Sequence, residues 1–156
     1  MCNHKKRKTM NYFEVKVKRM KADAQGVFKE VNELYLADAV SVADAQYKVE
    51  QMILAYDSVA LMSVTVAREV KYKELFLAGD MDDDRYFKAA VGIITLDEKT
   101  GREKKARQNM LVRAGNLCEA CARLEAGMKD SMMDYDVVSI ADAKYVEIVG
   151  QDAKPE

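Results

Sequence analysis

The chain contains few of the residues on which common catalytic and structural sites depend. Among its 156 residues there are one histidine, one proline, three cysteines and no tryptophan. The histidine is His4, so a Ser-His or Cys-His nucleophile pair has no base within the body of the chain. Three cysteines are too few, and odd in number, for the disulfide framework of a small secreted protein. These absences favour a protein of a reducing compartment that is not an enzyme.

Long apolar runs and a strong net charge are missing as well. No stretch approaches the roughly 18 apolar residues of a membrane span, and the basic start "MCNHKKRKTMNYFEV" lacks the apolar segment of a signal peptide. The net charge is −1, so the field of the whole molecule attracts neither nucleic acid nor membrane. There is no glycine-rich loop of the Walker or dinucleotide-binding type. We therefore expect a cytoplasmic protein with no membrane partner and no cofactor.

Two nearly identical stretches reveal how the chain is organised. "KYKELF" occupies 71–76 and "KYVEIV" occupies 144–149. Upstream of each echo there is a Tyr-Phe pair, a turn containing glycine, a second extended segment, a helical segment and an apolar strand. This order predicts an internal duplication of two β-β-α-β repeats, at 11–77 and 86–149, in which each echo ends the third strand of its own half. An acidic linker at 78–85 joins them, preceded by a basic flexible leader at 1–10 and followed by a disordered tail at 150–156.

The periodicity supports these assignments. Phe13, Val15 and Val17 alternate with charged residues, as in a half-buried strand, whereas "FKAAVGIITL" is apolar on both faces and predicts a more central strand. Each helical segment carries one apolar stripe. The stripe residues are Val42, Ala45, Val49, Met52 and Tyr56 in the first and Leu117, Ala120, Cys121, Leu124 and Met128 in the second. The sequence therefore predicts an α+β fold, a single domain at 11–149 with a mainly antiparallel sheet, or two sheets related by a pseudo-twofold axis, and with the two helices on one side.

Both helical segments begin with the same capping signal. Ser41 is followed three residues later by Asp44, and Asn116 is followed three residues later by Glu119. A Ser or Asn side chain accepts from free backbone N–H groups of the first turn, and the acidic residue reaches back to the cap. We expect the two helices to start at these residues.

With these segments assigned, the chain resembles a domain family of unknown function that is encoded by Bacteroidetes and by their phages and mobile elements. The stretches that carry the resemblance are "YFEVKVK", "YLADAVSVADA", "ITLDEKTGREKK", "NMLVRAGNLCEA" and "EAGMKDSMMDY". They span 11–149. The resemblance implies a small cytoplasmic protein of a phage or mobile element. It carries over no catalytic or binding residue, because the family has no assigned activity.

The clearest charge feature is the segment "GREKKARQNMLVR" at 101–113. Its cations are Arg102, Lys104, Lys105, Arg107 and Arg113, against the single acid Glu103. On a strand the first two share one face and the last three the other. The leader adds Lys5, Lys6, Arg7 and Lys8. Together these residues predict a phosphate-binding surface for nucleic acid, with Tyr12 and Tyr86 as stacking aromatics. The alternative is a solvated edge strand, whose lysines and arginines discourage pairing with other sheets.

Other motifs favour structural explanations. Cys118 and Cys121 form a C-x-x-C at a helix start, which suits a redox pair or half of a zinc site, but their position by the apolar stripe favours small buried residues. The run Asp80, Asp82, Asp83 and Asp84 resembles a calcium loop but lacks its glycine and final glutamate, which favours a solvated linker. Glu74 and Glu147 of the two echoes are further candidates for a shared ligand contact.

Three functional classes remain open from the sequence. The first is a non-enzymatic protein that binds nucleic acid through the basic hairpin. The second is a homo-oligomeric accessory protein of the counter-defence type, which binds a host or phage protein or a small nucleotide. Ten methionines, including Met128, Met132 and Met133, suit an adaptable contact surface or the filling of a core. The third and least favoured is an enzyme.

Overall fold

The computed structural model of the chain describes residues 11–79 and 83–150. The basic leader, Asp80, Asp82 and the tail beyond Gly150 lie outside these ranges. Within them the chain forms eight strands and two helices, grouped in two compact units. One unit comprises the chain up to Val70 together with the segment from Tyr145 onward, and the other is the continuous segment Lys71–Lys144.

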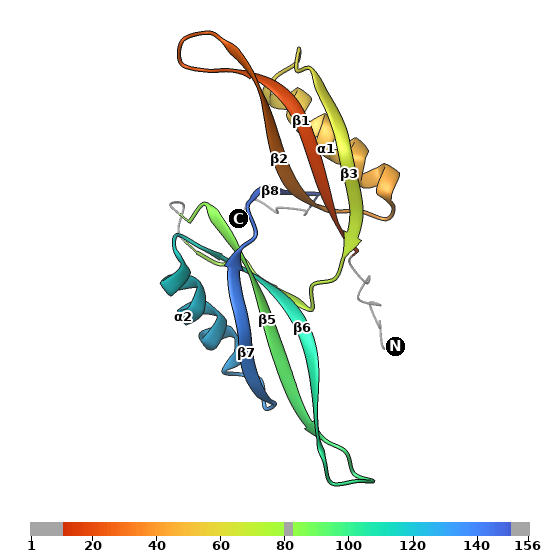
Figure 1. Cartoon of the computed structure of the whole chain (residues 1–156), viewed down its shortest axis with the longest axis vertical. Helices are drawn as coiled ribbons and strands as arrows, with labels where there is room; N and C mark the ends of the chain where they lie inside the picture. Colours follow the sequence, from red (N-terminus) through yellow and green to blue (C-terminus); the bar gives the residue numbers. More distant parts are fainter. Residues whose placement is uncertain (1–10, 80–82, 151–156) are drawn as a thin grey trace, which may run out of the picture. The chain divides into compact units, whose positions relative to one another are not determined.

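The first unit is a four-stranded sheet covered on one face by a helix (Figure 1). Its elements are β1 (Tyr12–Ala22), β2 (Phe28–Asp38), α1 (Val42–Tyr56), β3 (Met62–Val70) and β8 (Tyr145–Val149). The strand order is β3-β1-β2-β8. All pairings are antiparallel except the one between β2 and β8, which is parallel. Both β1 and β2 are therefore interior strands, although β1 presents Lys16 and Lys18 to solvent.

The second unit has the same plan. Its elements are β4 (Glu74–Phe76), β5 (Arg85–Leu96), β6 (Glu103–Ala114), α2 (Leu117–Met128) and β7 (Asp134–Asp142). The strand order is β4-β6-β5-β7, and only the pairing between β4 and β6 is parallel. The predicted central position of the apolar strand is confirmed for β5. The α+β class with two helices and mainly antiparallel pairing is also confirmed, and of the two predicted arrangements the structure has the one with two sheets.

Each helix buries three residues against its own sheet. In α1 they are Ala45, Val49 and Ile53, and in α2 they are Ala120, Leu124 and Met128. Three predicted stripe residues in the end turns of the helices are exposed instead, although Met128 in the last turn of α2 is buried. Val42 is 42% exposed, Tyr56 77% and Leu117 47%.

The predicted capping signals are confirmed in both helices. The Ser41 side chain accepts from the backbone N–H of Asp44 at 3.1 Å, and Asn116 accepts from Glu119 at 2.9 Å. In return, each acidic side chain accepts from the backbone N–H of the residue before the cap, at 3.1 Å in both helices. These reciprocal bonds satisfy N–H groups that the first turn of a helix leaves unpaired.

The turns between the first two strands of each unit also correspond. Gly26 and Gly101 have φ values of 79° and 68°, a backbone conformation that glycine adopts without a steric penalty. In both turns an aspartate, Asp23 or Asp97, accepts from the backbone N–H two residues later, at 2.9 Å. The two glycine-containing turns of the sequence are therefore tight connections of β-hairpins.

The sequence echoes form separate strands, and each one joins the sheet of the other half. We expected each echo to end the third strand of its own half, and this is wrong. The first echo leaves β3 at Val70 and forms β4 beside β6, whereas the second forms β8 beside β2. Units and sequence repeats consequently have different boundaries. Within the described ranges, no helix is long and apolar enough to cross a membrane.

Candidate functional site

The face of the second sheet that α2 does not cover carries a group of polar side chains. Alternation along β5 directs Phe87, Ala89 and Val91 to the core under α2, so Lys88 and Ala90 lie on the open face. The register brings residues of β6 and β7 level with them. They are Arg107 and Asn109 from β6 and Ser139 and Ala141 from β7.

These residues line a hollow of about 420 Å³, whose lining is Lys88, Ala90, Arg107, Asn109, Ser139 and Ala141. Ala90 and Ala141 contribute only methyl groups to this lining. Lys88 and Arg107 are exposed, and neither has an ion-pair partner within the described part of the chain. Guanidinium, ammonium, amide and hydroxyl groups are all donors to anionic oxygens, and this lining contains no carboxylate. The hollow is therefore suited chemically to a phosphate or another oxyanion.

The corresponding position in the first unit has the opposite character. Register places Glu14 and Arg68 where the second unit has Lys88 and Ala141. The Glu14 carboxylate is 9% exposed and accepts from the Tyr145 hydroxyl at 2.5 Å and from Arg68 Nη2 at 2.8 Å. Acid and base neutralise each other there. The same face of the first unit also carries the exposed Lys16, at the position equivalent to Ala90, so the two faces differ at the position of Lys88 rather than in having a cation at all.

Lys105 lies at the border of the hollow and is held by an ion pair. Its Nζ is 3.0 Å from Asp136 Oδ2 on β7, and both side chains are more than half exposed. To reach β7 the lysine crosses the central strand at Gly92, where a Cβ would overlap the Lys105 side chain. Glycine at this position therefore permits the crossing, and the exposed pair leaves Lys105 able to exchange partners.

The structure divides the predicted basic residues among different places. Lys104 lies on the other side of β6 from Lys105 and Arg107, as alternation predicted, and its Nζ is 3.5 Å from Asp97 Oδ2. Arg102 is exposed just before β6. Arg113 lies six residues beyond Arg107, roughly 20 Å along the strand, and donates from Nε to the backbone oxygen of Asp83 at 2.7 Å. Lys5, Lys6, Arg7 and Lys8 lie outside the described residues.

The sequence reasoning missed the three other polar residues that line the hollow with Arg107. Lys88, Asn109 and Ser139 are far apart in the chain and meet only through the strand register. One signal was present, because Lys88 is a lone charge in an otherwise apolar strand. Of the aromatic residues expected to stack bases, Tyr12 is 6% exposed and is therefore buried, and Tyr86 is half-buried.

Other predicted motifs have different outcomes. Cys118 is exposed and Cys121 is half-buried, so the expectation that both are buried is wrong, because Cys118 lies off the buried face of α2. In the described part of the chain no three His, Cys, Asp or Glu residues are grouped as metal ligands. Asp83 is 5% exposed rather than solvated. Met128 belongs to the core, whereas Met132 is fully exposed and Met133 is 52% exposed.

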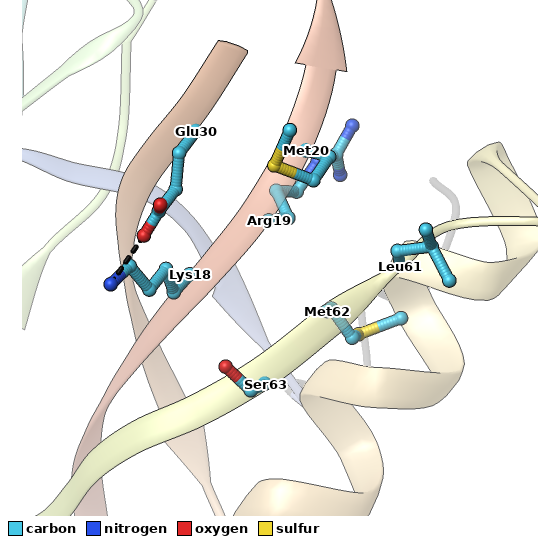
Figure 2. Close-up of a pocket in the computed structure, with 7 residues that line it drawn as sticks. All are labelled: Lys18, Arg19, Met20, Glu30, Leu61, Met62 and Ser63. Carbon is cyan, nitrogen blue, oxygen red and sulfur yellow. Dashed lines mark ion pairs between the residues drawn. The ribbon is translucent and has the colours of Figure 1, made fainter. Parts of the chain in front are cut away.

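A second pocket lies in the first unit, near the turn between β1 and β2 (Figure 2). It has a volume of about 270 Å³ and is lined by Lys18, Arg19, Met20, Glu30, Leu61, Met62 and Ser63. Its charges are compensated, because Lys18 pairs with Glu30 and Arg19 Nε lies 3.1 Å from Glu33 Oε1. The pocket offers apolar side chains from two strands but no unpaired charge in the described residues, so we do not assign it the main site.

Glu33 connects that region to a buried tyrosine. The Tyr35 hydroxyl donates to Glu33 Oε2 at 2.6 Å, and Tyr35 is 2% exposed. Burial, reinforced by the neighbouring Glu33 carboxylate, raises the pKa of the Tyr35 hydroxyl well above its ordinary value. The folded protein therefore retains this proton at pH values where an unfolded chain loses it.

Replacing Tyr35 by phenylalanine is expected to lower the free energy of unfolding at pH 8 by about 1–3 kcal/mol, because the Glu33 carboxylate loses its donor. Above pH 10 an unfolded chain releases the tyrosine proton and the folded protein does not. The free energy of unfolding of the wild type therefore falls with rising pH, and Tyr35→Phe lacks this contribution. Urea denaturation of both proteins from pH 8 to 11 measures the difference, which should shrink above pH 10; a constant difference contradicts the raised pKa.

Comparison with known proteins gives a family and nothing closer. No curated protein and no solved structure matches the chain. Residues 11–151 match the family described as "Domain of unknown function (DUF4494)". That range contains both units, the open face of the second sheet and both exchanged strands. The expected relation to a family of unknown function is thereby confirmed, and the chain belongs to the DUF4494 family.

Proposed function

We propose that the chain is a non-enzymatic cytoplasmic protein that binds the phosphate backbone of nucleic acid on the open face of its second sheet. The observation that supports this most directly is the hollow between Lys88 and Arg107, which has two cations, an amide and a hydroxyl in its lining. The lining includes no carboxylate and no imidazole that would serve as a general base. Its groups suit holding an anion rather than moving a proton.

The first unit supports the proposal by contrast. If the open face were only a solvated surface, similar charges would be expected on both sheets. In the first unit a carboxylate stands in the equivalent place and is paired with arginine, whereas the second unit has a lysine beside an alanine. The first sheet also presents Lys16 to solvent, so the support for a specialised face is limited to the position of Lys88, where the first sheet has the paired Glu14.

Nucleic-acid binding is expected to weaken steeply with salt and to depend on Arg107. Each neutralised phosphate contributes a slope of about −0.9 for duplex DNA and about −0.7 for single strands in a plot of log affinity against log salt. Fluorescence anisotropy with labelled single-stranded and duplex oligonucleotides, between 50 and 200 mM salt, measures this slope. Arg107→Ala and Lys88→Ala should each weaken binding and reduce the slope by about 1.

Lys21→Ala is the matched control, because it removes one exposed cation from the hairpin of the first unit. It should leave both affinity and slope nearly unchanged. Absence of binding at 50 mM salt, or binding that salt does not affect, contradicts the proposal. Equal effects of the control and of Arg107→Ala indicate general electrostatic attraction and also contradict it.

A second candidate is a homo-oligomeric accessory protein of a phage or mobile element that binds a host protein or a small nucleotide. Two observations favour it: the exposure of Met132 and Met133, and the size of the hollow, which suits one phosphate-bearing molecule as well as a backbone. A stable oligomer in light scattering together with salt-independent behaviour in the anisotropy experiment would favour this candidate. A Bacteroidetes origin belongs to the same proposal.

A further inference from the structure

The two strands formed by the echoes occupy equivalent positions in different units. In the first unit Ile148 and Val149 pair with Leu36 and Ala37. In the second unit the pairs are Leu75 with Leu111 and Phe76 with Val112. The β1–β3 and β5–β7 pairings each contain a bulge at the same point, after Lys16 in the first unit and after Ala90 in the second. Each unit therefore accepts a parallel final strand at the equivalent edge, and the β2–β8 pairing has in addition a register shift between Leu34 and Leu36.

The connection before each echo is too short for it to complete the sheet of its own half. In the first unit β3 and β8 lie at opposite edges, with two strands between them, about 14 Å apart. Val70 is level with Asp38, whereas Tyr145 is level with Leu34, about 13 Å further back along the strand. To take the position of Tyr145, Tyr72 would need to lie roughly 20 Å from Val70, and two residues span at most about 7 Å. The exchange is therefore imposed by the chain.

The short connection keeps each echo out of the sheet of its own half, and side-chain size differs at the two positions that the echoes occupy. At the position of Val149 the second unit has Phe76, a much larger side chain. On the helix that packs over this strand, equivalent positions counted from the caps are Met52 in α1 and Gly127 in α2. A Cβ at Gly127 would lie 2.5 Å from Phe76 Cε1 and 2.7 Å from its Cδ1. The large Phe76 thus lies against the small Gly127, whereas in the first unit the smaller Val149 belongs to the core cluster against which Met52 packs.

We propose that the groove between each helix and the adjoining β2 or β6 strand is a selective strand-binding site, and that Met52 and Gly127 are the residues that determine its specificity. The site beside α2 accepts an extended segment with an aromatic residue facing Gly127, and its occupant is β4 of the same chain. The site beside α1 accepts a segment with a small β-branched residue there, because Met52 already packs against the cluster that contains Val149. If the strands were interchanged, Phe76 would overlap Met52 beside α1, and Val149 would leave a cavity at Gly127 beside α2. Both arrangements are therefore disfavoured. This inference is independent of nucleic-acid binding.

Gly127→Ala tests the site because the direction in which it shifts the urea midpoint of unfolding shows whether the contact with Phe76 exists. In a helix free of such a contact, alanine in place of glycine is stabilising. Here the added methyl group overlaps Phe76, so the urea midpoint of full-length Gly127→Ala should fall below that of the wild type. In the background of Phe76→Val the same substitution should have no cost or should raise the midpoint. The Phe76→Val protein provides a folded reference if Gly127→Ala alone does not fold.

Exchange of strand identity tests selection directly. The full-length double variant Phe76→Val with Val149→Phe should lose hydrogen-exchange protection at the backbone amides of β4 and β8. Adding Met52→Gly and Gly127→Met should restore that protection in both strands. If Gly127→Ala raises the midpoint in both backgrounds, or if the fourfold variant is no better protected than the double variant, the assignment of Met52 and Gly127 is overturned.

Discussion

A fragment spanning residues 71–144 is expected to fold on its own, whereas a fragment spanning the sequence repeat 86–149 is not. The first fragment contains all five elements of the second unit, because that unit is one continuous segment. The second fragment lacks β4 and has β8 in excess. Without β4, β6 becomes an unprotected sheet edge and the core beside Gly127 loses the Phe76 ring.

The expected difference is large for a unit of this size. Removing a phenylalanine from a core costs about 3–5 kcal/mol, and the partial exposure of Phe76 places it near the lower value. A small domain has a total stability of only roughly 0.05–0.15 kcal/mol per residue, so this loss is a substantial part of the whole. Loss of the parallel pairing of β4 adds to it.

Circular dichroism, urea denaturation and amide NMR spectra of the two fragments provide the measurement. Fragment 71–144 should give a cooperative transition and dispersed amide signals, and fragment 86–149 should give neither. Phe76→Ala in fragment 71–144 is the control that separates the contribution of the ring from that of the strand. Two fragments of equal stability, or an unfolded 71–144, would refute the unit boundaries.

Much of the fold could be predicted because its determinants are local. Ser41 and Asn116 satisfy nearby backbone N–H groups, and the glycines of the two hairpin turns adopt a conformation that the local sequence requires. Spacing identified Ala45 and Val49 in α1 and the three buried residues of α2, but it missed Ile53, which is 1% exposed. Errors occurred at the ends of these patterns, where Tyr56 and Leu117 retain the period but extend beyond the sheet.

The partner of each echo could not be predicted from local pattern, because "KYKELF" and "KYVEIV" are nearly the same strand. What decides their location is the reach of a two-residue connection and the size of a residue on a helix elsewhere in the chain. The shared strand order and bulge position agree with the predicted duplication, which itself stays a prediction about how the chain arose. The similarity of the two echoes was visible in the sequence, but it did not indicate that each echo joins the sheet of the other half.

The candidate site shows the same limit. Arg107 and Lys105 were identifiable as neighbours on one face of a basic strand, but the charge density of that segment gave equal weight to Arg113, which is engaged elsewhere. Lys88 on β5 and Ser139 on β7 join the site because β5 pairs with both β6 and β7. No single segment of the sequence encodes these pairings. The site follows from the register of three strands, whereas the sequence offered a single charged stretch.

Asp83→Ala is expected to destabilise the second unit by about 3 kcal/mol, although this residue was predicted to lie in a solvated acidic linker. Asp83 Oδ2 lies 2.7 Å from Arg123 Nη2, and the aspartate side chain is only 7% exposed. Arg123 also donates from Nη1 to the backbone oxygen of Arg113 at 2.7 Å, while Arg113 donates to the backbone oxygen of Asp83. Three separate segments of the unit, the start of β5, the end of β6 and the middle of α2, are thereby tied together.

The size of this effect follows from what remains after the substitution. Breaking a buried ion pair on one side typically costs about 3–5 kcal/mol, because the other charge stays buried without compensation. Arg123 is 29% exposed and regains some hydration, so the lower value applies. Close packing adds a constraint, since a Cβ at Gly79 would lie 2.5 Å from Asp83 Oδ2, which leaves little room for the aspartate to move.

Urea denaturation of the full-length chain, with Asp84→Ala as the matched control, checks this expectation. Asp84 is the adjacent acid and is exposed, so its removal should change the free energy of unfolding by no more than about 0.5 kcal/mol. Asp83→Asn should fall between the two, because the amide retains one oxygen acceptor for Arg123 but no charge. If Asp83→Ala and Asp84→Ala have equal effects, the segment before β5 is a solvated linker after all. A large difference between the two variants identifies the segment before β5 as a structural part of the second unit. There Asp83 is held by Arg113 and Arg123, which lie 30 and 40 residues further along the chain.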